Sequence, residues 1–149
     1  VEFALQGRAV FSVDFGDDGL VYRGFVVEPQ ARISKPGFFG EGTFATASIG
    51  PIFATEKLHD YFYEVESQFA RAGRPAFDAS AGYLGTEANV AAGFELTDRW
   101  SLFVGSELGI YAGAANRDSA LFQDELNLSG FIGFSYTLFE SERRVPRGR

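Results

Sequence analysis

The side chains that could do chemistry in this sequence are mainly carboxylates in alternating apolar and polar stretches, at Glu64, Glu66, Glu87, Glu95 and Glu107. Two carboxylates can hydrolyse a glycoside when they lie roughly 5 to 10 Å apart across a sugar and an apolar pocket raises the pKa of one. No such pocket is evident around any pair. We therefore interpret these residues as the lining of a water-filled lumen, where water, amides and Arg8 or Arg32 satisfy the charges.

Other candidates for catalysis or metal binding are few. His59 is the only histidine and the chain has no cysteine, so neither a Zn²⁺ site nor a Ser-His-Asp triad is expected. The position of His59 in a predicted short connection suggests an exposed interface residue. Asp17, Asp18 and Gly19 resemble the start of a calcium loop without its terminal glutamate, and we predict a tight turn there. We expect no catalytic residue, no metal and no cofactor, and hence a protein that is not an enzyme.

The stretch 126–139 indicates most clearly which structure positions the carboxylates. A β-strand sends residues of alternate parity to opposite faces. One parity here is apolar and consists of Leu126, Leu128, Ile132, Phe134, Tyr136 and Leu138. The other parity is small and polar apart from Phe131, and it carries no charge. This pattern suits the wall of a barrel whose outside meets lipid.

Similar patterns predict seven strands, at 1–15, 20–34, 43–55, 61–69, 82–96, 100–112 and 126–139. A tilted membrane strand needs about 9 to 11 residues, and most of these stretches are long enough. The connections alternate: 16–19, 56–60 and 97–99 are short, whereas 35–42, 70–81 and 113–125 are long. Outer-membrane barrels have short periplasmic turns and longer extracellular loops. We predict an all-β, antiparallel up-and-down transmembrane β-barrel over residues 1–139, followed by a charged tail over 140–149.

On this fold we can assign residues to the lumen and to the membrane interface. The predicted lumen-lining residues are Glu2, Arg8, Glu64, Glu66, Glu87, Asn89, Glu95 and Glu107. The predicted interfacial aromatic residues are Tyr61, Trp100 and Tyr136, because aromatic girdles mark the two edges of the apolar band.

Length, charge and strand number narrow the class further. No apolar run approaches the roughly 20 residues of a spanning helix, which excludes a helical membrane protein. The formal net charge of −7 argues against a nucleic-acid partner, which would require a basic patch. Single-chain bacterial barrels have an even number of strands. We therefore expect an odd number of further strands upstream of Val1, in a longer barrel of which this is the C-terminal part.

Four segments carry a family resemblance. They are HDYFYEVES at 59–67, AGRPAFDASAGY at 72–83, the turn LTDRWSL at 96–102, and DSALF at 118–122. In this order they resemble the MipA/OmpV family of outer-membrane proteins. The resemblance implies a bacterial outer-membrane location and a scaffold that brings a lytic transglycosylase and a penicillin-binding synthase together. The charged tail 140–149 departs from the family, whose chains normally stop at the closing strand.

Two alternatives to the scaffold remain open. An acidic lumen would favour cations, so the barrel could be a channel or bind a small cationic solute. A soluble lipocalin-like barrel is the other possibility. The width of the lumen separates scaffold from channel, because a wall filled by Tyr83, Phe103, Tyr111 and Phe131 would be plugged.

Overall fold

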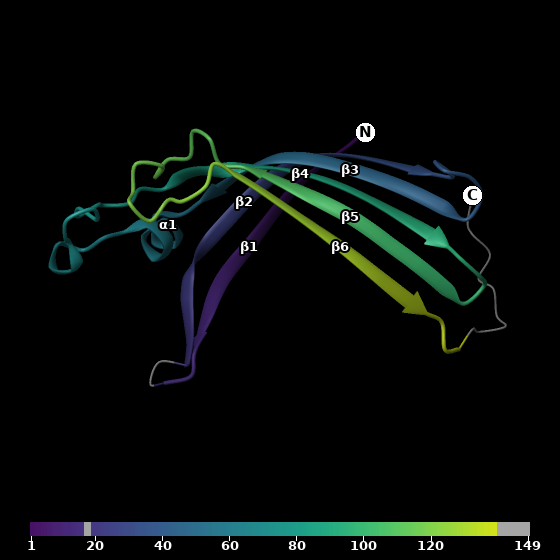
Figure 1. Ribbon diagram of the computed structural model, residues 1–149, viewed down its shortest axis with the longest axis horizontal. Helices are drawn as coiled ribbons and strands as arrows, with labels where there is room; N and C mark the ends of the chain where they lie inside the picture. The colour runs from purple at the N-terminus through teal and green to yellow at the C-terminus, as the bar shows by residue number, and fades with distance from the viewer. Residues whose placement is uncertain (17–18, 140–149) are drawn as a thin grey trace.

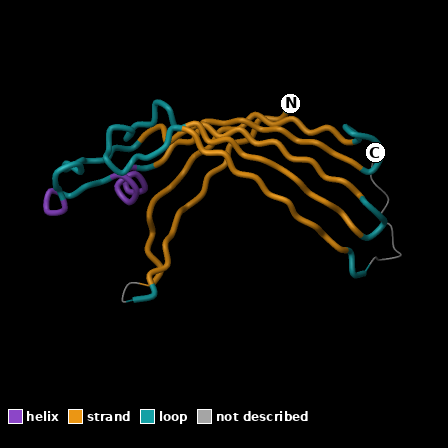
Figure 2. The backbone as a smooth tube through the Cα atoms, viewed as in Figure 1, coloured by secondary structure: helices purple, strands orange, loops and turns teal. Residues whose placement is uncertain are grey.

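The computed structural model describes residues 1–16 and 19–139 and consists of one strongly curved antiparallel sheet (Figure 1). Its strands are β1 (Glu2–Asp14), β2 (Gly19–Pro36), β3 (Thr43–Ala54), β4 (Gly82–Glu95), β5 (Trp100–Ile110) and β6 (Leu126–Tyr136). They lie in chain order, and each pairs antiparallel with the next. The sheet forms a half-barrel, with β1 and β6 at its two edges (Figure 2).

The alternating sequence gives the sheet two unlike faces. Residues paired across strands point to the same side, so the register assigns every strand position to one face. The convex face is almost wholly apolar and includes Phe3, Leu5, Val27, Ile33, Ala47, Val90, Val104, Leu128 and Ile132. The concave face is polar over its central part. The predicted apolar parity of the closing strand is confirmed, as Leu128 faces Leu108 and Ile132 faces Val104.

The predicted strand at 61–69 is wrong. Helix α1 (Glu56–Tyr63) and the 3-10 turn η1 (Ser67–Phe69) occupy this region. Leu58 of α1 packs on Val26, Ile52 and Ala54 to form the small buried core. The helix therefore lies against the concave side of the sheet, beside β2 at the end with the long connections (Figure 1). The alternating residues of 61–69 did not reveal this helix. Because it replaces the predicted strand, the structure has six described strands.

Gly24 makes room for α1 on the concave face. It lies next to a bulge in the β1–β2 ladder and has φ +143°, a conformation that side-chain-bearing residues rarely adopt. A Cβ at this position would lie 2.6 Å from Thr55 Oγ1 and 2.9 Å from Leu58 Cβ. The Thr55 hydroxyl accepts a hydrogen bond from the Phe25 backbone N–H at 3.0 Å, which ties the start of the helix to β2.

The corrected strand number changes which connections share a rim. The turns 37–42 and 96–99 lie at one end of the strands, the short-turn rim. The connections 55–81 and 111–125 lie at the other end, the long-connection rim, where β1 also meets β2. The predicted grouping of 97–99 with 16–19 is therefore wrong, and the 35–42 loop belongs with the short turns. Asp17 and Asp18 of the predicted tight turn lie outside the described residues, as does the tail 140–149.

Candidate functional site on the concave face

A hydrogen-bonded polar ladder crosses β1 and β2 on the concave face, near the mid-length of these two strands. Glu28 and Gln30 are buried, at 4% and 8% exposed. Gln30 donates its side-chain N–H to Glu28 and accepts from Gln6 at 3.0 Å. The Arg8 guanidinium lies 3.9 Å from the Glu28 carboxylate. A buried carboxylate needs such partners, and this part of the polar face is therefore tightly organised.

Further acidic groups line β4 and β5 on the same face. Glu87 pairs with Gly109, and Asn89 pairs with Glu107, in adjacent positions of the ladder. The Glu87 carboxylate is repelled by Glu107 and by Glu28, and attracted by Arg8. Around Glu87 the carboxylates of Glu28 and Glu107 therefore act against the single guanidinium of Arg8. Among the predicted lumen residues, Glu2 and Glu95 share this face nearer the short-turn rim.

Large aromatic rings occupy notches left by glycines of the concave face. The Tyr111 ring covers Gly85 and Gly109, and its hydroxyl lies 2.7 Å from where a Gly109 Cβ would be. Phe131 covers Gly105, and Phe44 covers Gly93. Tyr83, which we expected on this wall, instead faces Phe53 on the convex side, with ring centroids 6.0 Å apart. The cause is a bulge at Ile52/Phe53, which shifts the parity of β4 at its start.

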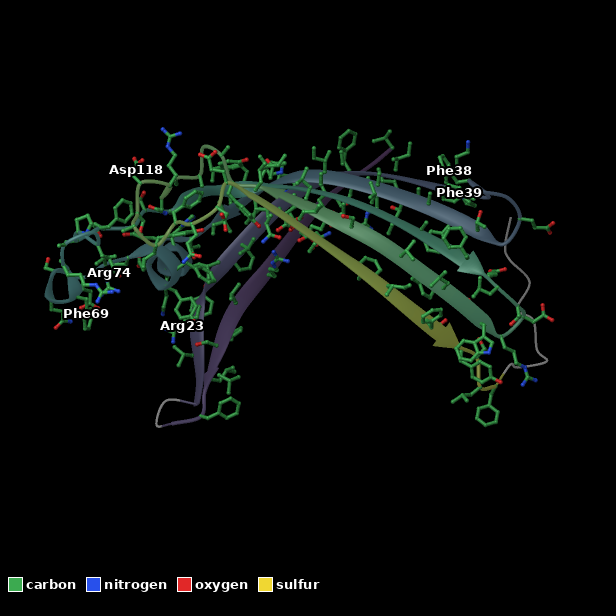
Figure 3. The ribbon with its side chains drawn as sticks, in the orientation of Figure 1. Arg23, Phe38, Phe39, Phe69, Arg74 and Asp118 are labelled. Carbon is green, nitrogen blue, oxygen red and sulfur yellow. The ribbon has the colours of Figure 1, made fainter. Side chains whose placement is uncertain are left out.

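Glu64 and Glu66, which we predicted to line the lumen from a strand, lie outside the sheet. They follow α1 and border a cavity of about 370 Å³ together with Asp60 and Arg74. The Arg74 guanidinium donates to the Phe69 carbonyl at 2.9 Å, and both residues lie at the far end of the long connection (Figure 3). Desolvation, followed by the charges of Asp60, Glu66 and Asp78, raises the pKa of the Glu64 carboxyl.

A buried polar cluster joins the two long connections, and it was missed in the sequence. The Asn116 side-chain amide donates to His59 Nδ1 at 2.7 Å and to the Ser80 carbonyl at 2.9 Å. Its carbonyl oxygen accepts from the Ser80 backbone N–H at 3.0 Å. His59 and Asn116 are each 1% exposed, so the expectation of an exposed His59 is wrong. We call His59, Ser80 and Asn116 the loop clasp.

The loop clasp is extended by neighbouring contacts. The Ser119 hydroxyl donates to the Tyr63 carbonyl at 2.6 Å, and the rings of Tyr63 and Phe122 lie 6.2 Å apart. Desolvation raises the pKa of the Tyr63 hydroxyl. Together these contacts hold α1 and the connection 111–125 as one cap at the long-connection rim. An asparagine after Gly113 is an ordinary loop residue in sequence, so only the three-dimensional structure identifies this role.

The predicted interfacial aromatics fall at opposite rims. Trp100 and Tyr136 pair across β5 and β6, with ring centroids 4.9 Å apart at the short-turn rim. Tyr61 lies on α1 at the long-connection rim, where the Arg23 guanidinium is 4.4 Å from its ring centroid. Figure 3 shows Arg23 beside β2, below α1. Tyr61 is therefore part of the cap rather than of a strand.

The short-turn rim carries an acidic hollow. It has a volume of about 700 Å³ and is lined by Glu41, Glu95, Asp98 and small polar residues. In the described part of the chain, no group of three or more histidine, cysteine or acidic side chains is arranged to hold a metal ion. No helix among those residues is both long and apolar enough to cross a membrane.

One of three comparisons with known proteins finds a match. The family model for MltA-interacting protein MipA matches residues 2–138, which covers all six strands and both long connections. No curated protein matches the chain, and no solved structure does. Because the family model spans nearly the whole sequence, the chain belongs to the MltA-interacting protein MipA family.

Proposed function

We propose that this protein is a non-enzymatic bacterial outer-membrane β-barrel that serves as a scaffold for enzymes of peptidoglycan remodelling. The two-faced sheet is the observation on which the proposal rests: its convex face is apolar and its concave face polar, as in a barrel surrounded by lipid. The family description names an interaction with MltA. We extend this to a lytic transglycosylase as one partner and a penicillin-binding synthase as another.

The sheet must be completed for the proposal to hold. In a bilayer, unpaired strand edges at β1 and β6 would leave backbone groups without hydrogen bonds. These two strands run in opposite directions, so antiparallel closure requires an even number of additional strands rather than the odd number that we first expected. Known barrels have at least about eight strands, so we propose that at least two further strands complete the ring.

In a completed barrel, the two rims can be assigned to the two sides of the outer membrane. Outer-membrane barrels place longer loops outside the cell and shorter turns in the periplasm. The long-connection rim with its cap would face outward, and the short-turn rim with its acidic hollow would face the periplasm. The enzymes to be scaffolded act in the periplasm, so their docking surface would include the turns 37–42 and 96–99.

This orientation makes the scaffold testable. Replacing Glu41 and Asp98 by lysine is expected to reduce capture of a lytic transglycosylase by the full-length protein at least tenfold, because the charge of the acidic hollow is reversed. Capture would be measured in detergent with purified partners. The matched control reverses Asp118 and Asp124, on the connection 111–125 at the opposite rim. Loss of capture in the control alone would place the partner outside the cell and contradict the scaffold orientation.

A second function is favoured by the acidic concave face. The carboxylates of Glu2, Glu28, Glu87, Glu95 and Glu107 outnumber the guanidinium groups of Arg8, Arg23 and Arg32 there. A pore lined by carboxylates selects cations. If the completed barrel conducts, exchanging Glu87 and Glu107 for glutamine is expected to reduce the cation-to-anion permeability ratio severalfold while leaving folding intact. The reversal potential across a planar bilayer under a salt gradient measures this ratio. An absence of conductance in the unmodified protein would leave the scaffold as the function.

A further inference from the structure

The convex face has one charged side chain among the outward positions of the six described strands, and this is Lys35. It lies one residue before the end of β2, next to the short-turn rim, and faces Ala45 of β3. All its outward neighbours along β2 after the bulge, from Phe25 to Ile33, are uncharged. A lone ammonium at the edge of an apolar face is therefore a feature that the barrel fold itself does not require.

Below Lys35 the convex face is hollowed. A groove of about 540 Å³ runs over β2, β3, β4 and β5, and its walls are almost entirely apolar. The floor is made of small side chains, Ala45, Ala47, Ala92, Val90, Val104 and Ser106. Larger residues surround this floor, so the groove is a product of side-chain size rather than of a gap between strands.

Two phenylalanines from the turn 37–42 form the rim-side wall of the groove. Phe38 and Phe39 lie on the convex side, above β3 in Figure 3. The Phe39 ring stacks on Phe94 with centroids 5.6 Å apart, and the Lys35 ammonium lies 5.5 Å from the centroid of Phe38. Aromatic rings and a lysine at one edge of an apolar band are the groups that settle at the level of lipid headgroups.

We propose that this groove is a binding site for an anionic glycerophospholipid, with an acyl chain along the alanine floor and the headgroup phosphate paired with Lys35. The inference rests on the proposed membrane location and goes beyond it, since it assigns one lipid position and one class of headgroup. A long apolar groove matches an acyl chain, and the single cation at its end matches a negative headgroup. The orientation of the rims places this lipid in the periplasmic leaflet.

Charge is the feature that separates a specific site from ordinary contact with lipid. Any phospholipid can lay an acyl chain on an apolar surface, whereas only a headgroup with net negative charge gains from Lys35. A basic residue near an anionic membrane surface changes lipid affinity about fivefold. The site therefore predicts selectivity for phosphatidylglycerol over phosphatidylcholine that depends on this one side chain.

The test uses the complete barrel protein, refolded in detergent, stripped of lipid, and titrated with phosphatidylglycerol or phosphatidylcholine while native mass spectrometry counts bound lipids. We expect preferential retention of one phosphatidylglycerol, and about a fivefold loss of this preference in Lys35→Gln. Ala47→Leu, which narrows the floor of the groove, is expected to weaken retention of both lipids. Lys57→Gln is the matched control, because Lys57 is the only other lysine and lies on α1.

Three results would overturn the proposal. Equal retention of the two lipids would exclude the site, as would an unchanged preference in Lys35→Gln or the same loss in Lys57→Gln. Heat-modifiable gel migration of the same samples in phosphatidylcholine vesicles separates this failure from failure of the membrane proposal. A protein that folds into these vesicles but shows no lipid preference contradicts the lipid site alone. A protein that does not fold into them contradicts both the lipid site and the membrane proposal.

Discussion

Replacing Leu128 by arginine is expected to destabilise the folded protein in a bilayer by about 2 to 4 kcal/mol, the cost of a charge at the middle of a lipid-facing strand. Leu128 lies on the convex face opposite Leu108 and is 76% exposed. Contact between this side chain and water is unfavourable, and the proposed lipid surrounding would remove that cost. The free energy of unfolding in urea, measured in phospholipid vesicles, gives the cost directly.

The adjacent residue provides the control. Ser129 lies on the concave face opposite Glu107, so Ser129→Arg adds the same charge one residue along the chain, next to a carboxylate. Little or no destabilisation is expected. Neighbouring strand residues face opposite sides of the sheet. The two variants therefore compare the convex with the concave face, while the strand, the depth in the bilayer and the introduced side chain stay nearly the same. Equal effects of the two substitutions, or no effect of either, would contradict the assignment of the convex face to lipid.

The strands were predictable because their pattern is local. Alternation over ten or more residues marks most of them, and all six strands begin and end within three residues of the predicted bounds. The same alternation places Glu87, Asn89 and Glu107 on one side of the sheet. The sequence could not reveal the bulges, which depend on how partner strands meet and which moved Tyr83 to the convex face.

Helix α1 illustrates why the long connections were harder to predict. Tyr61, Tyr63 and Val65 alternate like strand residues, and alternation alone cannot distinguish a short amphipathic helix from a strand. The decision comes from Leu58, which is 3% exposed because it packs on Val26 and Ile52. Val26 lies more than thirty positions earlier in the chain, so a contact remote in sequence selects the helix. Counting 61–69 as a strand then assigned every later connection to the wrong end of the sheet.

The cap adds a structural element that the barrel pattern does not demand. α1 packs on the concave side of β2 near the long-connection rim, and the loop clasp joins it to the connection 111–125. In the proposed orientation this cap lies at the outer rim, and the acidic hollow lies at the periplasmic rim. The acidic hollow, rather than the cap, would then be available to a periplasmic partner.

Removing the Asn116 side chain is expected to release this cap. Asn116→Ala leaves His59 Nδ1 and the paired backbone groups of Ser80 without their partner, and each buried polar group left unsatisfied costs about 1 to 3 kcal/mol. The connection 55–81 should then open far more often than the sheet unfolds. Trypsin cleavage after Arg71, followed by mass spectrometry of the protein in detergent, measures this opening, and we expect cleavage at least tenfold faster.

The control removes the same amide from the sheet. Asn127 is exposed on the concave face of β6. Asn127→Ala therefore removes the same side-chain amide without leaving a buried polar group unsatisfied, and cleavage should stay at the rate of the unmodified protein. Equal cleavage of all variants would mean that the two connections are held by the Tyr63 and Ser119 contacts alone.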